Sequence, residues 1–309
     1  MPRPRLLRGS CLTVAVATLA GCGSAAHETS ATAPPSAVKS TPLVDAGRPP
    51  YITALAVDPA DRSLLLATNR GLYRIDAEGR HARPIAAQAR AEGREGPFGQ
   101  RVSSLAFVGG RELLGSGHPN GTAGGLPPFL GVIESLDGGR RWSAIARAGM
   151  SDLHVLVASG AAVYGFDTVL GGVVASSDEG RSFAERLAPP GEALVLDMAI
   201  DPHEHRHLLA STLTAIFSSP DGGNTWRRIA AGAEAHLAWM APGLYRADAD
   251  RSVQASTDGG ATWRRVGSLP RTPGKLVELP DGTLYAALID GSIVSSRDGG
   301  HSWKGLFAP

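Results

Sequence analysis

The sequence predicts an all-β protein: a single β-propeller of four-stranded blades, six in number, with seven as the alternative. An eight-residue pattern, Ser-x-Asp-x-Gly-x-x-aromatic, occurs five times, and its successive Asp residues are 41, 43, 37 and 40 residues apart. Four-stranded propeller blades have this length. Short apolar stretches punctuated by Gly, Pro, Asn and Asp fill the intervals, whereas helix-forming runs are scarce.

Residues 1–21 have the composition of an export signal. Three arginines precede the apolar stretch Leu12 to Leu19, which is too short to cross a bilayer. The junction Leu19-Ala20-Gly21-Cys22 resembles the lipobox of bacterial lipoproteins. This resemblance implies that Cys22 becomes the lipid-modified N-terminus, so that the protein is anchored to a bacterial cell membrane on its extracytoplasmic side.

Composition limits the classes of function. Residues 22–49 are rich in Ala, Ser, Thr and Pro and predict a disordered tether, which leaves residues 50–309 for the propeller. The only cysteines are Cys11 and Cys22, so the mature chain has neither a disulfide nor a catalytic thiol. The formal net charge is +1, and no basic cluster suggests a nucleic-acid partner. We expect a monomer without a cofactor, attached to the membrane through its lipid.

The five repeats predict structural hairpin turns. In each, the Asp carboxylate is expected to accept hydrogen bonds from backbone N–H groups, while Gly supplies a positive φ and the aromatic residue packs between sheets. Calcium binding is the alternative, but each loop offers one carboxylate and calcium takes six to eight oxygens. The structural aspartates of these turns are Asp137, Asp178, Asp221, Asp258 and Asp298.

The first blade is predicted from strands at 52–57, 63–68 and 71–75, followed by a decayed repeat at 76–79. Counting this repeat gives six blades. The interval from Asp76 to Asp137 exceeds one blade by about 20 residues, and we assign the excess to insertions at 84–100 and 117–130. A seventh blade would require a further repeat in this interval.

Strand order sorts the connections onto two faces. The repeats and the Asp-Pro turns lie on one face, whereas loops between second and third strands and between blades lie on the other, together with both insertions. Long loops on a rigid scaffold commonly carry binding sites. The candidate catalytic residues on this second face are Asp152 and Asp167, and the candidate ligand-binding residues are Arg101, His118, His154 and Tyr164.

These candidates allow more than one interpretation. An Asp–His pair could perform general acid-base catalysis, and two histidines with a carboxylate could hold a metal. We predict no metal site, leaving open whether His118 and His154 bind one, because such residues also fix turns in solvated loops. Tyr164 fits a core position better than a catalytic one. A second group, formed by His203, Glu204, His205 and His207, lies in an Asp-Pro turn, where alternate side chains diverge.

The repeat resembles the Asp-box, or bacterial neuraminidase, repeat. Segments such as Gly117-His118-Pro119, Asp152-Leu153-His154 and Tyr164-Gly165-Phe166-Asp167 resemble a group of bacterial lipoproteins labelled sialidase-like or glycosyl hydrolases. The resemblance implies a six- or seven-bladed propeller and contact with carbohydrate. It does not imply sialidase activity, because true sialidases carry a Phe/Tyr-Arg-Ile/Leu-Pro motif, and this chain has only Arg83-Pro84-Ile85, out of order.

Three functions follow as hypotheses. The first is a non-catalytic module that binds a glycan or a protein. The second is a glycoside hydrolase, which needs two carboxyl groups about 5 to 9.5 Å apart. The third is an assembly scaffold for a membrane complex. The same fold serves all three, so the site has to decide among them.

Overall fold

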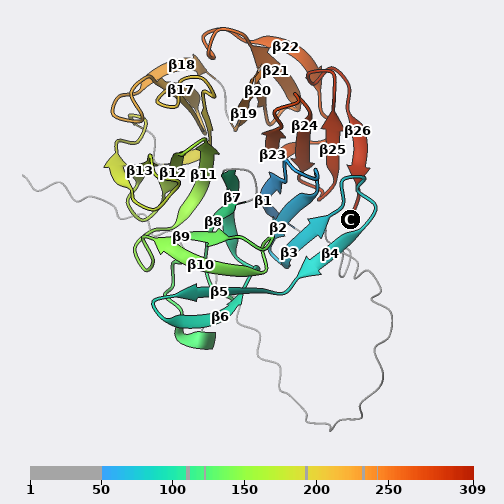
Figure 1. The fold of residues 1–309 in the computed structure, drawn as a ribbon. Coiled ribbons are helices and arrows are strands. Elements are labelled where there is room, and N and C mark those ends of the chain that lie inside the picture. Colours follow the sequence, from blue (N-terminus) through green and yellow to red (C-terminus); the bar gives the residue numbers. More distant parts are fainter. Residues whose placement is uncertain (1–50, 109–111, 122, 192–193, 232–233, 242) are drawn as a thin grey trace, which may run out of the picture. The chain divides into compact units, whose positions relative to one another are not determined.

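The computed structural model describes residues 51–108, 112–121, 123–191, 194–231, 234–241 and 243–309. They form six four-stranded antiparallel blades arranged in a ring, which is a six-bladed β-propeller (Figure 1). The predicted signal (1–21) and tether (22–49) lie outside the described residues. No helix in the described part of the chain is long and apolar enough to cross a membrane.

Each blade takes its four strands from consecutive sequence, running from the innermost strand to the outermost. The first three blades are β1 (Ile52–Val57), β2 (Leu64–Thr68), β3 (Gly71–Ile75) and β4 (Ala82–Ile85); β7 (Val102–Val108), β8 (Glu112–Gly117), β9 (Val132–Ser135) and β10 (Arg141–Ala146); and β11 (Leu153–Ser159), β12 (Ala162–Asp167), β13 (Gly172–Ser176) and β14 (Ala184–Arg186).

The last three blades repeat this order. They are β15 (Val195–Ile200), β16 (Leu208–Thr212), β17 (Ala215–Ser219) and β18 (Arg227–Ala231); β19 (His236–Met240), β20 (Gly243–Ala247), β21 (Ser252–Ser256) and β22 (Arg264–Ser268); and β23 (Pro273–Glu278), β24 (Leu284–Leu288), β25 (Ile293–Ser296) and β26 (Lys304–Phe307).

The ring closes through side chains. Blades one and six have no strand in common among the described residues, and the segment 43–50, which could supply one, lies outside them. Instead β1 contacts β23, and an apolar cluster joins the two blades. Arg62 spans the junction: its guanidinium lies 2.8 Å from the Asp281 carboxylate and donates a hydrogen bond of 2.6 Å to Thr283.

The first insertion differs from its predicted form. Residues 84–100 were expected to be a loop on the second face, but they contain the hairpin β5 (Ala87–Ala91) and β6 (Arg94–Phe98). Strand β5 pairs in parallel with β10, so the sheet of blade two has six strands. The second insertion, with the short 3₁₀ turn η1 (Ala123–Gly125), contacts β6. The hairpin thus extends the outer edge of blade two (Figure 1). Of the first insertion, only Gln100, which follows the hairpin, reaches the mouth of the ring.

The repeats form the predicted turns, here called the Ser-Asp-Gly turns. In the fourth, the Ser256 hydroxyl donates to Asp258 and accepts from the Gly260 N–H at 2.9 Å. The side chain and backbone N–H of Thr262 also donate to Asp258, and together these bonds lower the pKa of Asp258 to about 2. The same Ser–Asp and Gly–Ser bonds occur in the other four turns. These carboxylates therefore have a structural task within their own turns.

The aromatic residue of each turn packs between blades, as predicted. Trp142 is fully buried, with its ring 5.7 Å from that of Phe98 and its indole N–H bonded to the Gly139 carbonyl. The corresponding residues of the other turns pack against clusters shared by two neighbouring blades: Phe183, Trp226, Trp263 and Trp303.

Candidate functional site

A cavity of about 640 Å³ lies at the mouth of the ring on the face opposite the Ser-Asp-Gly turns. Its walls are the first residues of the inner strands and the neighbouring loops. We call it the loop-face cavity, and its polar lining includes Arg101, Ser103, His118, His154, His236 and Lys275. Three of the four candidate ligand-binding residues are therefore brought together here.

A repeated irregularity aims residues into this cavity. In five blades the inner strand has a register shift at its second residue, which leaves that residue outside the regular pairing. Bulges of this kind re-aim side chains and are common beside functional sites. All five of the residues concerned line the cavity: Thr53, Ser103, His154, Leu196 and Gly274.

Three side chains converge at the edge of the cavity. The Nε2 atoms of His118 and His154 lie 3.3 and 3.0 Å from the same carboxylate oxygen, Oδ2 of Asp152. His118 comes from the second insertion, whereas Asp152 and His154 begin blade three. These are the only His, Cys, Asp or Glu side chains of the described chain that are grouped so as to hold a metal ion. We call the three residues the HDH cluster.

Asp152 is a buried carboxylate with defined partners. Burial would raise its pKa, but hydrogen bonds from His118 and His154 outweigh that effect and hold the pKa of Asp152 well below its ordinary value. Hydroxyl groups of Ser103 and Thr168 also lie within 3.4 Å of its two oxygens. A carboxylate held ionised in this way is poorly suited to donate a proton as a general acid.

Asp167, the second candidate catalytic residue, points away from the cavity. It is fully buried at the end of β12, where its Oδ1 accepts the backbone N–H groups of Asp152, Val169 and Leu170. Its Oδ2 faces the Arg147 guanidinium at 3.5 Å. These bonds hold the loop that carries Asp152, so Asp167 has the geometry of a positioning residue.

The two remaining candidates differ in position. Arg101 is exposed at the cavity and has no ion-pair partner among the described residues, while its carbonyl accepts the backbone N–H of His118. Tyr164 lies instead in the apolar core between blades three and four, where burial raises its pKa. It does not line the cavity, in keeping with the core position that its strand predicted.

The histidine-rich turn does not form a cluster. His203 and His205 are exposed in the connection between β15 and β16, whereas His207 bonds to Ser218 and packs edge-on against Trp239. The side chains diverge as the sequence pattern indicated.

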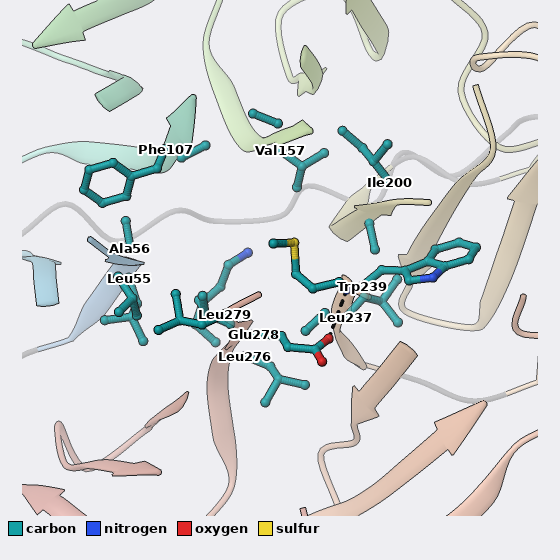
Figure 2. A pocket seen from close by; sticks show the side chains of 18 of the residues that line it. Leu55, Ala56, Phe107, Val157, Ile200, Leu237, Trp239, Leu276, Glu278 and Leu279 are labelled. Atoms are coloured by element: carbon teal, nitrogen blue, oxygen red, sulfur yellow. Dashed lines mark hydrogen bonds between the residues drawn. The ribbon is translucent and has the colours of Figure 1, made fainter. Parts of the chain in front are cut away.

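A second cavity, of about 260 Å³, lies at the turn-face end of the channel (Figure 2). We call it the turn-face cavity. Apolar side chains of all six inner strands line it, and Glu278 extends its carboxylate among them. One carboxylate oxygen accepts the N–H of Met240 at 3.0 Å, and the other has no hydrogen-bond partner among the described residues. Burial raises the pKa of Glu278 to about 8.

A buried ionic group lies between the cavities. Asp197 accepts hydrogen bonds from the Lys275 ammonium at 2.7 Å and from the backbone N–H of Leu237, and His236 lies at 3.4 Å. Lys275 lines both cavities, while Asp197 is about 1% exposed. Burial would raise the pKa of Asp197, but Lys275 and His236 hold it below its ordinary value.

Sequence reasoning missed these channel groups. Asp197, Lys275 and Glu278 each stand in an inner strand that otherwise reads as apolar. A charged residue inside a strand that the fold places against the channel is the available signal, because such charges are rarely buried without a partner or a function.

Exposed apolar side chains also favour the loop face. Nine large hydrophobic residues are exposed in the described chain, and eight of them lie in connections on the loop face. The exception, Leu136, lies in a Ser-Asp-Gly turn on the opposite face. Those on the loop face are Tyr51, Met150, Val169, Leu170, Leu187, Leu194, Leu213 and Ile289. Tyr51, Leu194 and Ile289 line the loop-face cavity itself. Exposed apolar groups beside polar ones are a common feature of binding surfaces.

Comparison with known proteins shows the fold. No protein-family model matches the sequence, and no curated protein does. Among solved structures, the chain resembles YCF48 from Cyanidioschyzon merolae, with a TM-score of 0.50 and 16% identity over 85% of this chain and 86% of that one. A structure of YCF48 bound to D1 peptide gives 0.44 and 17% identity, over 68% and 69%.

The Niastella koreensis GH74 enzyme is a further structural neighbour. The TM-score is 0.54 with 16% identity, and the match covers 84% of this chain but 45% of the enzyme. The chain thus spans about half the length of that enzyme. At these identities the comparisons support a shared β-propeller architecture and nothing more specific.

Proposed function

We propose that this protein is an extracytoplasmic, lipid-anchored binding module whose ligand, a glycan or a protein segment, enters the loop-face cavity. The observation that carries the proposal is the cavity itself, in which Arg101, His118 and His154 converge from two neighbouring blades. Its volume lies within the range of ordinary ligand sites. About half of its lining residues are polar or charged, and the others form apolar walls.

A binding role is favoured over glycoside hydrolysis by the two candidate catalytic carboxylates. Asp167 is buried beneath the loop that carries Asp152 and accepts hydrogen bonds from backbone N–H groups. Asp152 is held as a carboxylate between His118 and His154. Hydrolysis needs one carboxyl group that donates a proton and a second that faces the sugar. The likeness to a GH74 enzyme concerns the fold and supplies neither group.

The test is binding of the chain from residue 23 onward, which keeps every described residue, to glycan and peptide arrays. We expect saturable binding that Arg101→Ala weakens roughly tenfold, the loss of one charge-assisted contact. Arg264→Ala is the matched control, because Arg264 is an exposed arginine on the outer strand β22. It should leave binding unchanged.

A panel of aryl glycosides should be run beside the arrays. Binding without turnover supports the proposal. Turnover that Asp167→Asn abolishes would show that the protein is a hydrolase and overturn the proposal. An equal loss of binding in the Arg101 and Arg264 variants would show that the ligand does not bind in the loop-face cavity.

A further inference from the structure

The HDH cluster brings three possible metal-ligand atoms close together. Its three side chains each offer a ligand atom, and these atoms all lie within 4.8 Å of one another. The cluster spans two blades, because His118 follows β8 and the other two residues flank the start of β11. No single turn motif therefore explains it.

The hydrogen bonds of His118 restrict what can lie between these atoms. Its Nδ1 is 2.9 Å from the Pro128 carbonyl, which can only accept, so Nδ1 must carry a hydrogen. If the second nitrogen carries no hydrogen, the lone pair of Nε2 faces Oδ2 of Asp152 at 3.3 Å. Two lone pairs repel at this distance, and either a proton on Nε2, which makes the hydrogen bond to Asp152, or a metal ion between the two atoms removes the conflict.

A metal ion between these atoms would have suitable geometry. Zinc bonds of about 2.0–2.1 Å at tetrahedral angles place neighbouring ligand atoms about 3.3 Å apart. The two Nε2–Oδ2 distances are 3.3 and 3.0 Å. The Nδ1–H bond to Pro128 is also the outer contact by which metal-bound histidines are commonly oriented.

Neighbouring groups hold the cluster in place. The Phe129 ring packs edge-on against His118 at 5.5 Å, and the backbone N–H of Asp152 is held by Asp167. His118 and His154 line the loop-face cavity. A metal there would have three protein ligands and an open position toward the cavity, which is the arrangement of zinc sites that bind exchangeable ligands.

We propose that His118, Asp152 and His154 bind a divalent transition-metal ion of the zinc class at the edge of the loop-face cavity. The donor set of two imidazole nitrogens and one carboxylate oxygen suits zinc and cobalt and disfavours calcium and magnesium, which take oxygen ligands. This proposal departs from the sequence-based expectation of no metal site, which left open whether His118 and His154 bind one.

The metal also specifies a ligand class. Its open position lies near Arg101, whose backbone bonds to that of His118. A metal ion and a guanidinium together suit an anionic oxygen, such as a carboxylate or phosphate group of the ligand. This second step rests on the proposed binding function, whereas the metal site does not.

The experiment uses the chain from residue 23 onward, freed of metal with a chelator and titrated with Zn²⁺ by calorimetry. We expect one Zn²⁺ per chain, and affinity reduced at least roughly tenfold in His154→Ala. His154 is about half exposed, so its removal should leave the fold intact. His203→Ala is the matched control, because it removes an exposed histidine from the opposite face.

Co²⁺ gives a readout that needs no variant. Its visible absorption should indicate bound imidazole in four- or five-fold coordination. The absence of saturable Zn²⁺ binding, or binding that His154→Ala leaves unchanged, overturns the proposal. Because Zn²⁺ alone is the probe, failure of the glycan and peptide arrays does not affect this result, and failure of Zn²⁺ binding does not affect the arrays.

Discussion

Replacing Asp197 by Asn is expected to lower the free energy of unfolding by about 3 kcal/mol at pH 7. The carboxylate is almost fully buried and balances Lys275 at 2.7 Å. Removing one partner of a buried pair leaves the other charge unpaired, at a cost of about 3–5 kcal/mol. Lys275 retains some solvent exposure, which favours the lower end of this energy range. Denaturant unfolding at fixed pH measures the change.

The loss of stability caused by Asp197→Asn should depend on pH. The pKa of Asp197 is lowered by folding, so its stabilising contribution is present above the unfolded value near 3.8 and is lost as pH falls through the folded value. The difference between Asp197→Asn and the native chain should therefore shrink below about pH 4.

A double variant is the control. Replacing Lys275 by Met as well as Asp197 by Asn should recover part of the loss, because neither charge of the pair is then left without its partner. A double variant less stable than Asp197→Asn alone would show that the pair is not the source of the effect.

Replacing Glu278 by Gln is expected to change stability in the opposite direction, raising it by roughly 3 kcal/mol at pH 7. Burial raises the pKa of this carboxyl from 4.5 to about 8, and one of its oxygens has no hydrogen-bond partner among the described residues. Each pKa unit corresponds to about 1.36 kcal/mol, and about 2.5 units are in effect at pH 7. Gln keeps an acceptor for the Met240 N–H.

The gain in stability from Glu278→Gln should increase with pH. Below pH 4.5 Glu278 is protonated in the folded and the unfolded chain, so it does not lower the stability of the native chain. As the pH rises toward about 8, ionisation of Glu278 in the unfolded chain progressively lowers the free energy of unfolding. Thermal unfolding of the two chains should coincide near pH 4 and separate progressively up to pH 8. A constant difference at all pH values would mean that ionisation of Glu278 is not the cause.

The sequence was most informative where the interactions are local. Each Ser-Asp-Gly turn makes its hydrogen bonds within eight residues, so the pattern specified the turn, and the spacing specified the blade. The strand boundaries of blade one agree to within one residue of the structure: 63–68 was expected for β2, and Leu64–Thr68 is observed.

The hairpin β5–β6 was missed although its signal is present. Ala87, Ala89 and Ala91 are buried and alternate with exposed Gln88 and Arg90. Alanine is only weakly apolar, so the alternation is easily read as loop composition. The Glu92-Gly93 turn, with both φ values positive, has the backbone form of a tight hairpin.

Convergence across blades could not be predicted. His118 and Asp152 are 34 positions apart, and whether they meet depends on the twist of two sheets and on a bulge at the start of β11. The sequence therefore identified the members of the HDH cluster as candidates without showing that they share one oxygen. The buried state of Glu278 depends in the same way on closure of the whole ring.

We place ligand binding on the loop face, and blocking each face in turn distinguishes this from binding at the turn face. The chain from residue 23 onward has no cysteine, so a single thiol can be introduced by Ile289→Cys at the loop-face cavity or by Leu136→Cys in a Ser-Asp-Gly turn. Both positions are well exposed, at 62% and 73%.

Each thiol is coupled to a bulky maleimide, and binding to the array ligands is measured before and after coupling. We expect coupling at position 289 to abolish binding and coupling at position 136 to leave it unchanged. Binding that survives the block at 289 and disappears with the block at 136 would contradict this expectation.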